Sequence, residues 1–425
     1  MTGARDSADR DTSPAFADAA GAPKAFARSR LRWLAIGVFV LSSSLNYVDR
    51  LLLAALAPTI KNEFHLSSAG YGSVISAFSL VYAFAAPLAG WIVDRVGLNA
   101  GVTLAMTIWS LAGAATGFTR GWGGLIACRT VLGSGEAAGI PCTAKANGLY
   151  LGAEDLAFGT AMNQVGITIG SVAAPLLVAA LAPWYGWRFP FMLCGLAGFA
   201  WLPLWWFTSR RIPAPAASAT AVSAPVADLL RDPRMWALVA ANALVMTLYA
   251  LWTNWTTLYL VQERHLSEMA ANREFAWIPP LFATLGGFCG GWLAFRAIRS
   301  GRAVQAARMR VCWISGVILL VTALVPLAPT PILAAAAISA SFFWCLSIST
   351  NLYAMPIDWY GPGRAAFGVS MLTCSFGLMT ALLSPAIGFV VDRIGFAPVC
   401  LVMASLPLAG IAMLDAATRK AFARA

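Results

Sequence analysis

Charged side chains are scarce in this sequence. Asp, Glu, Lys and Arg make up 11% of its 425 residues, and only two histidines occur. Soluble globular proteins typically contain about 25% charged residues. Here 59% of the residues are hydrophobic, and the mean hydropathy is +0.72. So little charge cannot cover the surface of a water-soluble protein of this length, which excludes a large soluble fold.

Sequence patterns for several kinds of chemistry are also absent. The eight cysteines lie singly in or beside apolar segments, with no CxxC pair and no Cys/His cluster, so neither a disulfide framework nor a metal site is indicated. There is no phosphate-binding glycine loop and no nucleophile elbow. We therefore expect a protein that is not an enzyme and that uses no cofactor.

Long apolar segments recur along the whole chain, and twelve of them could each cross about 30 Å of hydrocarbon as a helix. The sequence predicts an all-α integral membrane protein with twelve transmembrane helices. The segments cover residues 33–57, 70–92, 100–119, 122–145, 158–183, 188–208, 235–261, 275–297, 309–328, 331–355, 365–391 and 396–417.

The net charge of +11 is distributed unevenly between the two sides of the predicted membrane. With both termini inside, most of the 29 Lys and Arg residues fall in the tails and inside loops. This asymmetry follows the positive-inside rule, and it explains the basic character of the chain without a nucleic-acid partner. We expect a multi-pass protein of the inner (plasma) membrane with both termini in the cytoplasm.

The polar segments divide the chain into two halves. Residues 1–32 lack the apolar core of a signal peptide and predict a disordered cytoplasmic tail, and residues 209–234 contain a Pro- and Ala-rich linker. Two six-helix bundles, 33–208 and 235–418, are then expected. Glu63-Phe64-His65-Leu66-Ser67 matches Glu263-Arg264-His265-Leu266-Ser267 about 200 residues later, which indicates a duplication with pseudo-two-fold symmetry.

Two pairs of opposite charges lie inside apolar segments. Asp49 and Arg50 follow Asn46-Tyr47-Val48 in the first segment, and Arg129 and Glu136 lie about two helical turns apart in the fourth. Ionisable groups at membrane depth cost at least about 2.5–3.5 kcal/mol each, so they are retained where they face a protein interior or a water-filled cavity. We expect these four side chains to point into one cavity.

The loop after the second segment resembles that of a known superfamily. Gly90-Trp91-Ile92-Val93-Asp94-Arg95-Val96-Gly97 is similar to the G-x-x-x-D-R-x-G loop of the major facilitator superfamily. The two charged segments, Asn46 to Arg50 and Arg129 to Ala137, resemble its anion:cation symporter family, including a bacterial branch that takes up hexuronates and aldonates with protons. The resemblance covers about residues 31–417, and it implies that Asp94 and Arg95 form a cytoplasmic gate.

The sequence departs from the family pattern near this gate in three ways. Leu98 and Asn99 follow the loop glycine where a second basic residue is usual, Phe295 stands where the counterpart loop usually has Asp, and Asp155 occupies the position of a cation. We therefore expect the gate to be connected differently, without consequences for the central charges.

The chemistry of the four central charges assigns their roles. A guanidinium stays charged at physiological pH and can hold a carboxylate in a bidentate manner, so Arg50 and Arg129 are the candidates for binding an anion. A purely structural role, with each Arg neutralising its neighbour, is the alternative. Asp49 and Glu136 are the candidates for carrying protons, since access to water and to substrate changes the environment of each carboxyl group.

Uncharged polar and aromatic residues on the apolar segments complete the predicted lining. They can donate hydrogen bonds to hydroxyl groups or stack on a sugar ring, although lipid-facing positions are the alternative for the tryptophans. The predicted lining residues are Tyr47, Tyr82, Gln164, Asn254, Trp255 and Asn351.

Together these features predict a proton-coupled symporter of a small organic anion, such as a hexuronate or an aldonate, acting as a monomer in the lipid bilayer. Two alternatives remain open. An antiporter or exporter would share the fold, and the same arginines could hold an aromatic carboxylate such as phthalate.

Overall fold

The computed structural model describes residues 31–152, 155–212 and 227–422, and in these ranges all regular structure is helical. Residues 1–30 of the predicted tail and 213–226 of the predicted linker lie outside them. The helices are α2 (Leu31–Ala55), α3 (Ala57–Glu63), α4 (Ser68–Val96), α5 (Leu98–Thr116), α6 (Trp122–Glu136), α7 (Gly139–Tyr150), α8 (Leu156–Tyr185), α9 (Arg188–Arg211), α10 (Ala227–Arg231), α11 (Pro233–Gln262), α12 (Glu268–Ala270), the π-helix η1 (Ala271–Ala276), α13 (Ile278–Arg299), α14 (Val304–Ile318), the 3-10 helix η2 (Leu319–Leu327), α15 (Pro331–Tyr360), α16 (Pro362–Ile394) and α17 (Phe396–Phe422).

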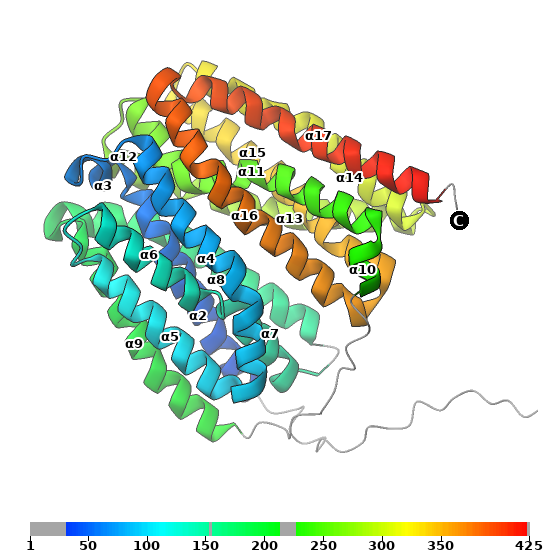
Figure 1. The fold of residues 1–425 in the computed structure, drawn as a ribbon, viewed down its shortest axis with the longest axis horizontal. Coiled ribbons are helices and arrows are strands. Elements are labelled where there is room, and N and C mark those ends of the chain that lie inside the picture. Colours follow the sequence, from blue (N-terminus) through cyan, green and yellow to red (C-terminus); the bar gives the residue numbers. More distant parts are fainter. Residues whose placement is uncertain (1–30, 153–154, 213–226, 423–425) are drawn as a thin grey trace, which may run out of the picture.

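The helices form two bundles that lie side by side. Figure 1 shows α2 to α9 together in one bundle and α11 to α17 in the other, with α4 and α16 in contact where the bundles meet. The bundle formed by α2 to α9 we call the N half, and the bundle formed by α11 to α17 the C half. This arrangement confirms the predicted all-α architecture.

Eleven helical segments within the described residues are long and apolar enough to cross a membrane alone. The predicted fourth span is the exception, because it is broken into α6 and α7 at Ala137 and Ala138. Pro141 has no amide hydrogen to donate to the carbonyl of Ala137, which weakens the helix at this point. Together, α6 and α7 occupy the place of the predicted fourth span, in addition to the eleven long helical segments. Glu136 is the last residue of α6 before the break.

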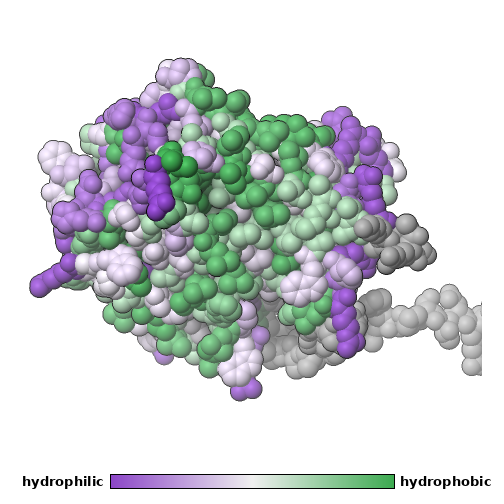
Figure 2. Space-filling view, turned by 45° about the horizontal axis from the view of Figure 1, so that its top comes forward, coloured by the Kyte–Doolittle hydropathy of each residue, from purple (hydrophilic) through white to green (hydrophobic). Residues whose placement is uncertain are grey.

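Large apolar side chains cover the outside of the bundles. Figure 2 shows hydrophobic residues across the middle of one face and hydrophilic residues toward its ends. Phe84 and Leu382, for example, are 64% and 71% exposed. Exposed apolar side chains suit a hydrocarbon environment. The helices suit it too, because their backbone hydrogen bonds are formed within each helix. The chain is therefore a multi-pass membrane protein.

The predicted duplication has a matching local geometry. His65 and His265 are the two non-glycine residues with positive φ among those described, at 50° and 53°. Two residues later, the side chains of Ser67 and Ser267 accept hydrogen bonds from Gly70 and Ala270 and cap the next helices. Both halves thus make the same turn at the same point.

The two ends of the interface between the halves differ. At the end that carries Asp392 (the Asp392 end), the helices approach closely, since a Cβ added to Gly72 would lie 2.2 Å from the carbonyl oxygen of Ser384. At the end that carries Asp94 (the Asp94 end), a cavity of about 890 Å³ separates α4 and α7 from α16. The interface is closed at one end and open at the other.

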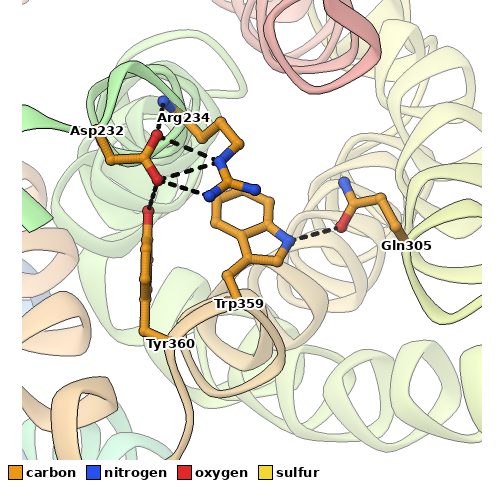
Figure 3. A network of polar contacts seen from close by, with 5 residues as sticks. All are labelled: Asp232, Arg234, Gln305, Trp359 and Tyr360. Atoms are coloured by element: carbon orange, nitrogen blue, oxygen red, sulfur yellow. Dashed lines mark hydrogen bonds and ion pairs between the residues drawn. The ribbon is translucent and has the colours of Figure 1, made fainter. Parts of the chain in front are cut away.

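A network at the Asp94 end fixes the start of the C half (Figure 3). Asp232 caps α11 by accepting from the backbone N–H of Arg234, and it also binds the Arg234 guanidinium and the Tyr360 hydroxyl. The neighbouring Trp359 donates to Gln305 on α14 at 3.0 Å. These contacts join α11, α14 and α15 directly after the linker.

Candidate functional site

Arg50 and Glu136 form an ion pair across the N half. From α2, Nε and Nη2 of Arg50 donate to the same oxygen, Oε2 of Glu136, at 3.1 and 2.9 Å. The guanidinium also lies over the rings of Tyr47, Phe78 and Tyr82, at 4.7–5.0 Å from their centroids. Because Oε1 of Glu136 is buried without a hydrogen bond, the pair is only half satisfied.

Arg129 is the less compensated of the two cations. Its side chain comes from α6 and is 1% exposed, with the guanidinium 5.4 Å from the ring centroid of Phe191. Nη1 lies 3.5 Å from the carbonyl oxygen of Asp49, while Nε and Nη2 have no hydrogen-bond acceptor. A buried guanidinium with two unpaired donors is costly, and an incoming anion would relieve that cost.

Asp49 is buried next to Arg129. It is 1% exposed, and neither of its carboxylate oxygens accepts a hydrogen bond. It packs against Gly113 of α5, where an added Cβ would stand 2.9 Å from Oδ1. Among the described residues the Asp49 carboxylate forms no ion pair, and Arg129 reaches only the backbone carbonyl of Asp49.

Both arginines line one cavity of about 70 Å³ between the halves. The N half contributes from α2, α4 and α6, and the C half from α11 and α16. Five of the predicted substrate-binding residues border this arginine cavity: Tyr47, Arg50, Tyr82, Arg129 and Asn254.

A second compartment, of about 60 Å³, shares Tyr249 and Thr253 with the arginine cavity. The predicted residue Gln164 lines it together with several hydroxyl groups. Thr168 of α8 and Thr284 of α13 meet here, and their hydroxyl oxygens lie 2.6 Å apart across the two halves. This hydroxyl compartment places neutral hydrogen-bonding groups next to the cations.

Tyr82 borders both the arginine cavity and the 890 Å³ vestibule that reaches the Asp94 end. It stacks on Phe78, with ring centroids 5.7 Å apart. Tyr82 is thus a wall residue of both the charged cavity and the vestibule.

The predicted gate residues lie at the mouth of this vestibule. Asp94 pairs with Lys145 at 3.0 Å, and Lys145 also donates to the carbonyl oxygen of Val93. Arg95 lies over Trp91, with its guanidinium 4.0 Å from the ring centroid. Each of these contacts lies within the N half.

Asp155, which departs from the family pattern, pairs with Arg32 of α2 at 2.8 Å. The acid at this position therefore joins α2 to the start of α8. This contact also lies within the N half, and it does not involve the central charges.

Two predicted residues lie away from the cavities. Trp255 is fully buried and packs edge-on against Tyr71 and Phe396. Asn351 is also fully buried, and its amide donates to the carbonyls of Gly290 and Ser347, which joins α13 to α15. In this conformation the two side chains hold helices together, and their roles toward a substrate stay predictions.

Sequence reasoning missed the hydroxyl groups Thr168, Thr253 and Thr284 and the rings Phe78 and Phe376. Thr on a membrane helix usually bonds to its own backbone one turn earlier, as Thr168 does to Gln164, so its presence carries little signal. A search for polar residues facing the same side of the fifth and eighth segments could have found Thr168 and Thr284. The described residues contain no group of three or more His, Cys, Asp and Glu suited to a metal ion.

Comparison with known proteins supports the same architecture. The hexuronate transporter of Escherichia coli (strain K12) is 27% identical over 401 residues, which cover 89% of this chain and 92% of the relative. The galacturonate transporter of Dickeya chrysanthemi is 28% identical over 285 residues, or 62% and 81% of the two chains.

The fold is shared with a solved bacterial homologue of the human lysosomal transporter Spinster, in an inward-facing and unoccupied conformation. The TM-score is 0.73 at 20% identity, over 91% of this chain and 95% of that one. The Major Facilitator Superfamily model matches residues 39–355. The resemblance inferred from the sequence is thus confirmed, and this chain belongs to the Major Facilitator Superfamily, a family of transporters rather than enzymes.

Proposed function

We propose that this protein takes up a small sugar acid, a hexuronate or an aldonate, together with protons. The observation that carries the proposal is the buried Arg129 guanidinium, which has two unpaired donors and shares a cavity between the halves with Arg50. An anion is the ligand that this arrangement lacks. The names of the E. coli and D. chrysanthemi relatives support a sugar acid as that anion.

In the proposed complex the substrate carboxylate lies between Arg129 and Arg50. The hydroxyl groups of the substrate extend toward Gln164 and the hydroxyl compartment, which begins at Thr253 on the border of the arginine cavity. Neutral donors and acceptors suit a polyhydroxylated chain, and an unpaired site discriminates against ligands that lack the matching groups. Tyr47, Tyr82 and Asn254 then contact the middle of the substrate.

Coupling to protons follows from competition for Arg50. The substrate carboxylate and Glu136 both seek this guanidinium, so substrate binding favours a protonated Glu136 that no longer needs an ionic partner. Asp49 is the second proposed proton carrier, placed next to Arg129. With the anion bound and one of the two acids protonated, the remaining carboxylate and the anion balance the two arginines, so the site carries no net charge when the halves rock.

We place the Asp94 end in the cytoplasm, in line with the excess of basic residues on that side. The vestibule then opens inward, and Asp94 and Arg95 belong to a cytoplasmic gate. The protein is proposed to work as a monomer in the inner membrane, with each half moving largely as a rigid body.

The test is uptake of labelled acids into proteoliposomes that contain the purified protein, with and without an inside-alkaline pH gradient. We expect concentrative uptake of galacturonate or glucuronate, or of an aldonate, and little uptake of phthalate. Preferred uptake of phthalate would replace the sugar acid by an aromatic carboxylate. One-for-one exchange without accumulation would instead indicate an antiporter.

A further inference from the structure

An acid from the C half caps a helix of the N half at the Asp392 end. Near the end of α16, Oδ1 of Asp392 accepts from the backbone N–H of Ser68 at 2.8 Å, and Oδ2 accepts from Ala69 at 3.0 Å. These amides belong to the first turn of α4. A carboxylate at a helix N-terminus gains both from the unpaired amides and from the helix dipole.

A cation completes this arrangement. Nζ of Lys61, at the end of α3, donates to Oγ of Ser68 at 2.6 Å, and the residue Lys61 is 9% exposed. Lys61 thus brings positive charge to the same turn of α4 that Asp392 caps. Electrostatic attraction between Lys61 and Asp392 adds to the two hydrogen bonds that Asp392 accepts from backbone N–H groups.

The backbones of α16 and α4 also lie so close together at this contact that there is no room for a side chain between them. A Cβ added to Gly388 would lie 2.2 Å from the carbonyl oxygen of Ser68, so α16 touches the start of α4 directly. Separation of the halves here requires loss of the Asp392 bonds, because the carboxylate belongs to one half and the amides to the other.

The sequence around Asp392 repeats the pattern of the loop at the opposite end. Gly388-Phe389-Val390-Val391-Asp392-Arg393-Ile394-Gly395 has the spacing of Gly90-Trp91-Ile92-Val93-Asp94-Arg95-Val96-Gly97. Because α4 and α16 lie side by side, the end of each helix is near the start of the other (Figure 1). Asp392 caps the start of α4, whereas the Asp94 side chain is 78% exposed and pairs with Lys145 of its own half.

We infer that Asp392 is a latch that closes the Asp392 end of the transporter, and that its release from Ser68 and Ala69 is required for that end to open. The latch is engaged while the vestibule at the other end is open. It therefore favours the inward-open conformation over the outward-open one, and it sets how often the cavity is exposed to the Asp392 side.

Two further contacts across the halves close the same end near α3. The Glu268 carboxylate accepts from the backbone N–H of Thr59 at 2.9 Å, and Asn272 donates to the carbonyl oxygen of Ala55 at 2.8 Å. These bonds reach the junction of α2 and α3, not the α4 and α16 pair. Removal of Asp392 alone therefore shifts the equilibrium between conformations without unfolding the interface.

The test uses a cysteine reporter in nanodiscs, where a thiol reagent reaches both ends. Ser384→Cys places the reporter on α16 at the tight contact with Gly72, where the side chain is 2% exposed. Labelling above that of the parent chain reports separation of α4 from α16. In Asp392→Asn we expect the labelling rate to rise about tenfold, which corresponds to about 1.4 kcal/mol.

Glu263→Gln is the matched control. It removes a carboxylate near the same end whose hydrogen bond, to the backbone N–H of Phe396 at 3.4 Å, stays within the C half. We expect the labelling rate of this variant to be unchanged. If the Ser384→Cys reporter were labelled at the same rate with and without Asp392→Asn, the inference that Asp392 is a latch would be wrong.

A second reporter separates opening from unfolding. Thr373→Cys lines the vestibule, and we expect its labelling to fall in Asp392→Asn as the outward-open conformation becomes more populated. A rise at both reporters would indicate a loosened protein and would contradict the inference. Lys61→Met, which leaves Asp392 in place, should shift both reporters in the same directions by a smaller factor. The readout needs no substrate, so its failure is distinct from failure of the proposed function.

Discussion

At the scale of residues, the central cavity holds two cations in different states. Arg50 has Glu136 as an ionic partner and three aromatic rings around it, whereas Arg129 keeps two donors unpaired in a site that is 1% exposed. Burying a charge without partners is unfavourable for folding. This makes the role of Arg129 testable separately from stability, because its removal should harm binding more than it harms the fold.

Arg129→Gln should lower sugar-acid uptake by about 30-fold or more, since loss of one partner of a buried charge pair costs about 2–5 kcal/mol. The melting temperature in detergent should stay the same or rise. Initial uptake rates and thermal unfolding are the measurements. Arg120→Gln, which changes an exposed arginine just before α6, is the control and should leave both quantities unchanged. Full uptake by Arg129→Gln would remove the proposed anion site.

Glu136→Gln should separate transport from coupling. The neutral amide cannot exchange protons or compensate Arg50, so accumulation driven by a pH gradient should be lost while exchange of labelled for unlabelled substrate continues. Counterflow and gradient-driven uptake are to be compared in the same vesicles. Glu63→Gln, which changes a partly exposed acid paired with Arg188, should retain both activities. Gradient-driven accumulation at the normal level in Glu136→Gln would exclude this acid as a proton carrier.

Charge made part of the site predictable from the sequence. Asp49, Arg50, Arg129 and Glu136 are conspicuous because ionisable groups are rare at membrane depth. Neutral residues carry a weaker signal, since a buried amide or indole serves equally well to join helices. Asn351 shows this, because its amide is used by two backbone carbonyls in the α13 and α15 contact.

At the scale of elements, the broken fourth span is the main difference from expectation. The sequence predicts one span over 122–145, and the structure has α6 and α7 with the break after Glu136. Pro141 and the glycines around the break are visible in the sequence, but Pro also occurs inside unbroken helices here, such as Pro87 in α4. Whether a proline interrupts a helix depends on how the surrounding helices pack around it, and this packing cannot be read from the sequence.

Close packing of α2 against α8 gives a prediction at this scale. A Cβ on Gly170 would lie 2.2 Å from the carbonyl oxygen of Ser44, so the two helices must move apart to accept it. Gly170→Ala should therefore destabilise the N half by about 1–3 kcal/mol, the usual cost of overpacking. The measurement is thermal or denaturant unfolding in detergent. Gly148→Ala in α7 is the matched control, because nothing lies within 4 Å of its added Cβ. Equal stability of the two variants would contradict the described packing.

The Asp232 network gives a prediction about pH. Burial alone would raise the pKa of Asp232, but hydrogen bonds from the Arg234 guanidinium, the Arg234 backbone N–H and the Tyr360 hydroxyl hold that pKa below its ordinary value of 3.8. A depressed pKa contributes stability that is fully present well above pH 3.8 and is lost as the pH falls through the folded-state pKa.

Asp232→Asn should accordingly lower the melting temperature at pH 7, and the difference from the parent should shrink as the pH falls below 3.8. Asn can still cap α11 through its side-chain oxygen, so Asp232→Ala should lose more at pH 7 than Asp232→Asn. Melting temperatures across the pH range in detergent are the measurement. A difference from the parent that grows toward low pH would show that Asp232 is not held ionised by this network.

At the scale of the whole molecule, the sequence predicted the helical class, the two halves and the family. Membrane thickness limits the length of each span, and the duplication leaves a repeated turn at His65 and His265. Which end of the interface between the halves is open could not be predicted from the sequence, because the contacts that close an end are short-range and involve few residues. The contact of Asp392 with α4 is visible only once α4 and α16 are placed together.

The central claim is that anion and proton cross the membrane together, and it can be tested without an imposed pH gradient. Labelled galacturonate, or whichever acid the uptake panel selects, is added outside proteoliposomes that contain a pH-sensitive dye, with both sides at pH 7 and the membrane potential clamped. We predict that the lumen acidifies as the label enters, and that Glu136→Gln abolishes the acidification. Entry of the label with no change in lumenal pH would contradict proton symport.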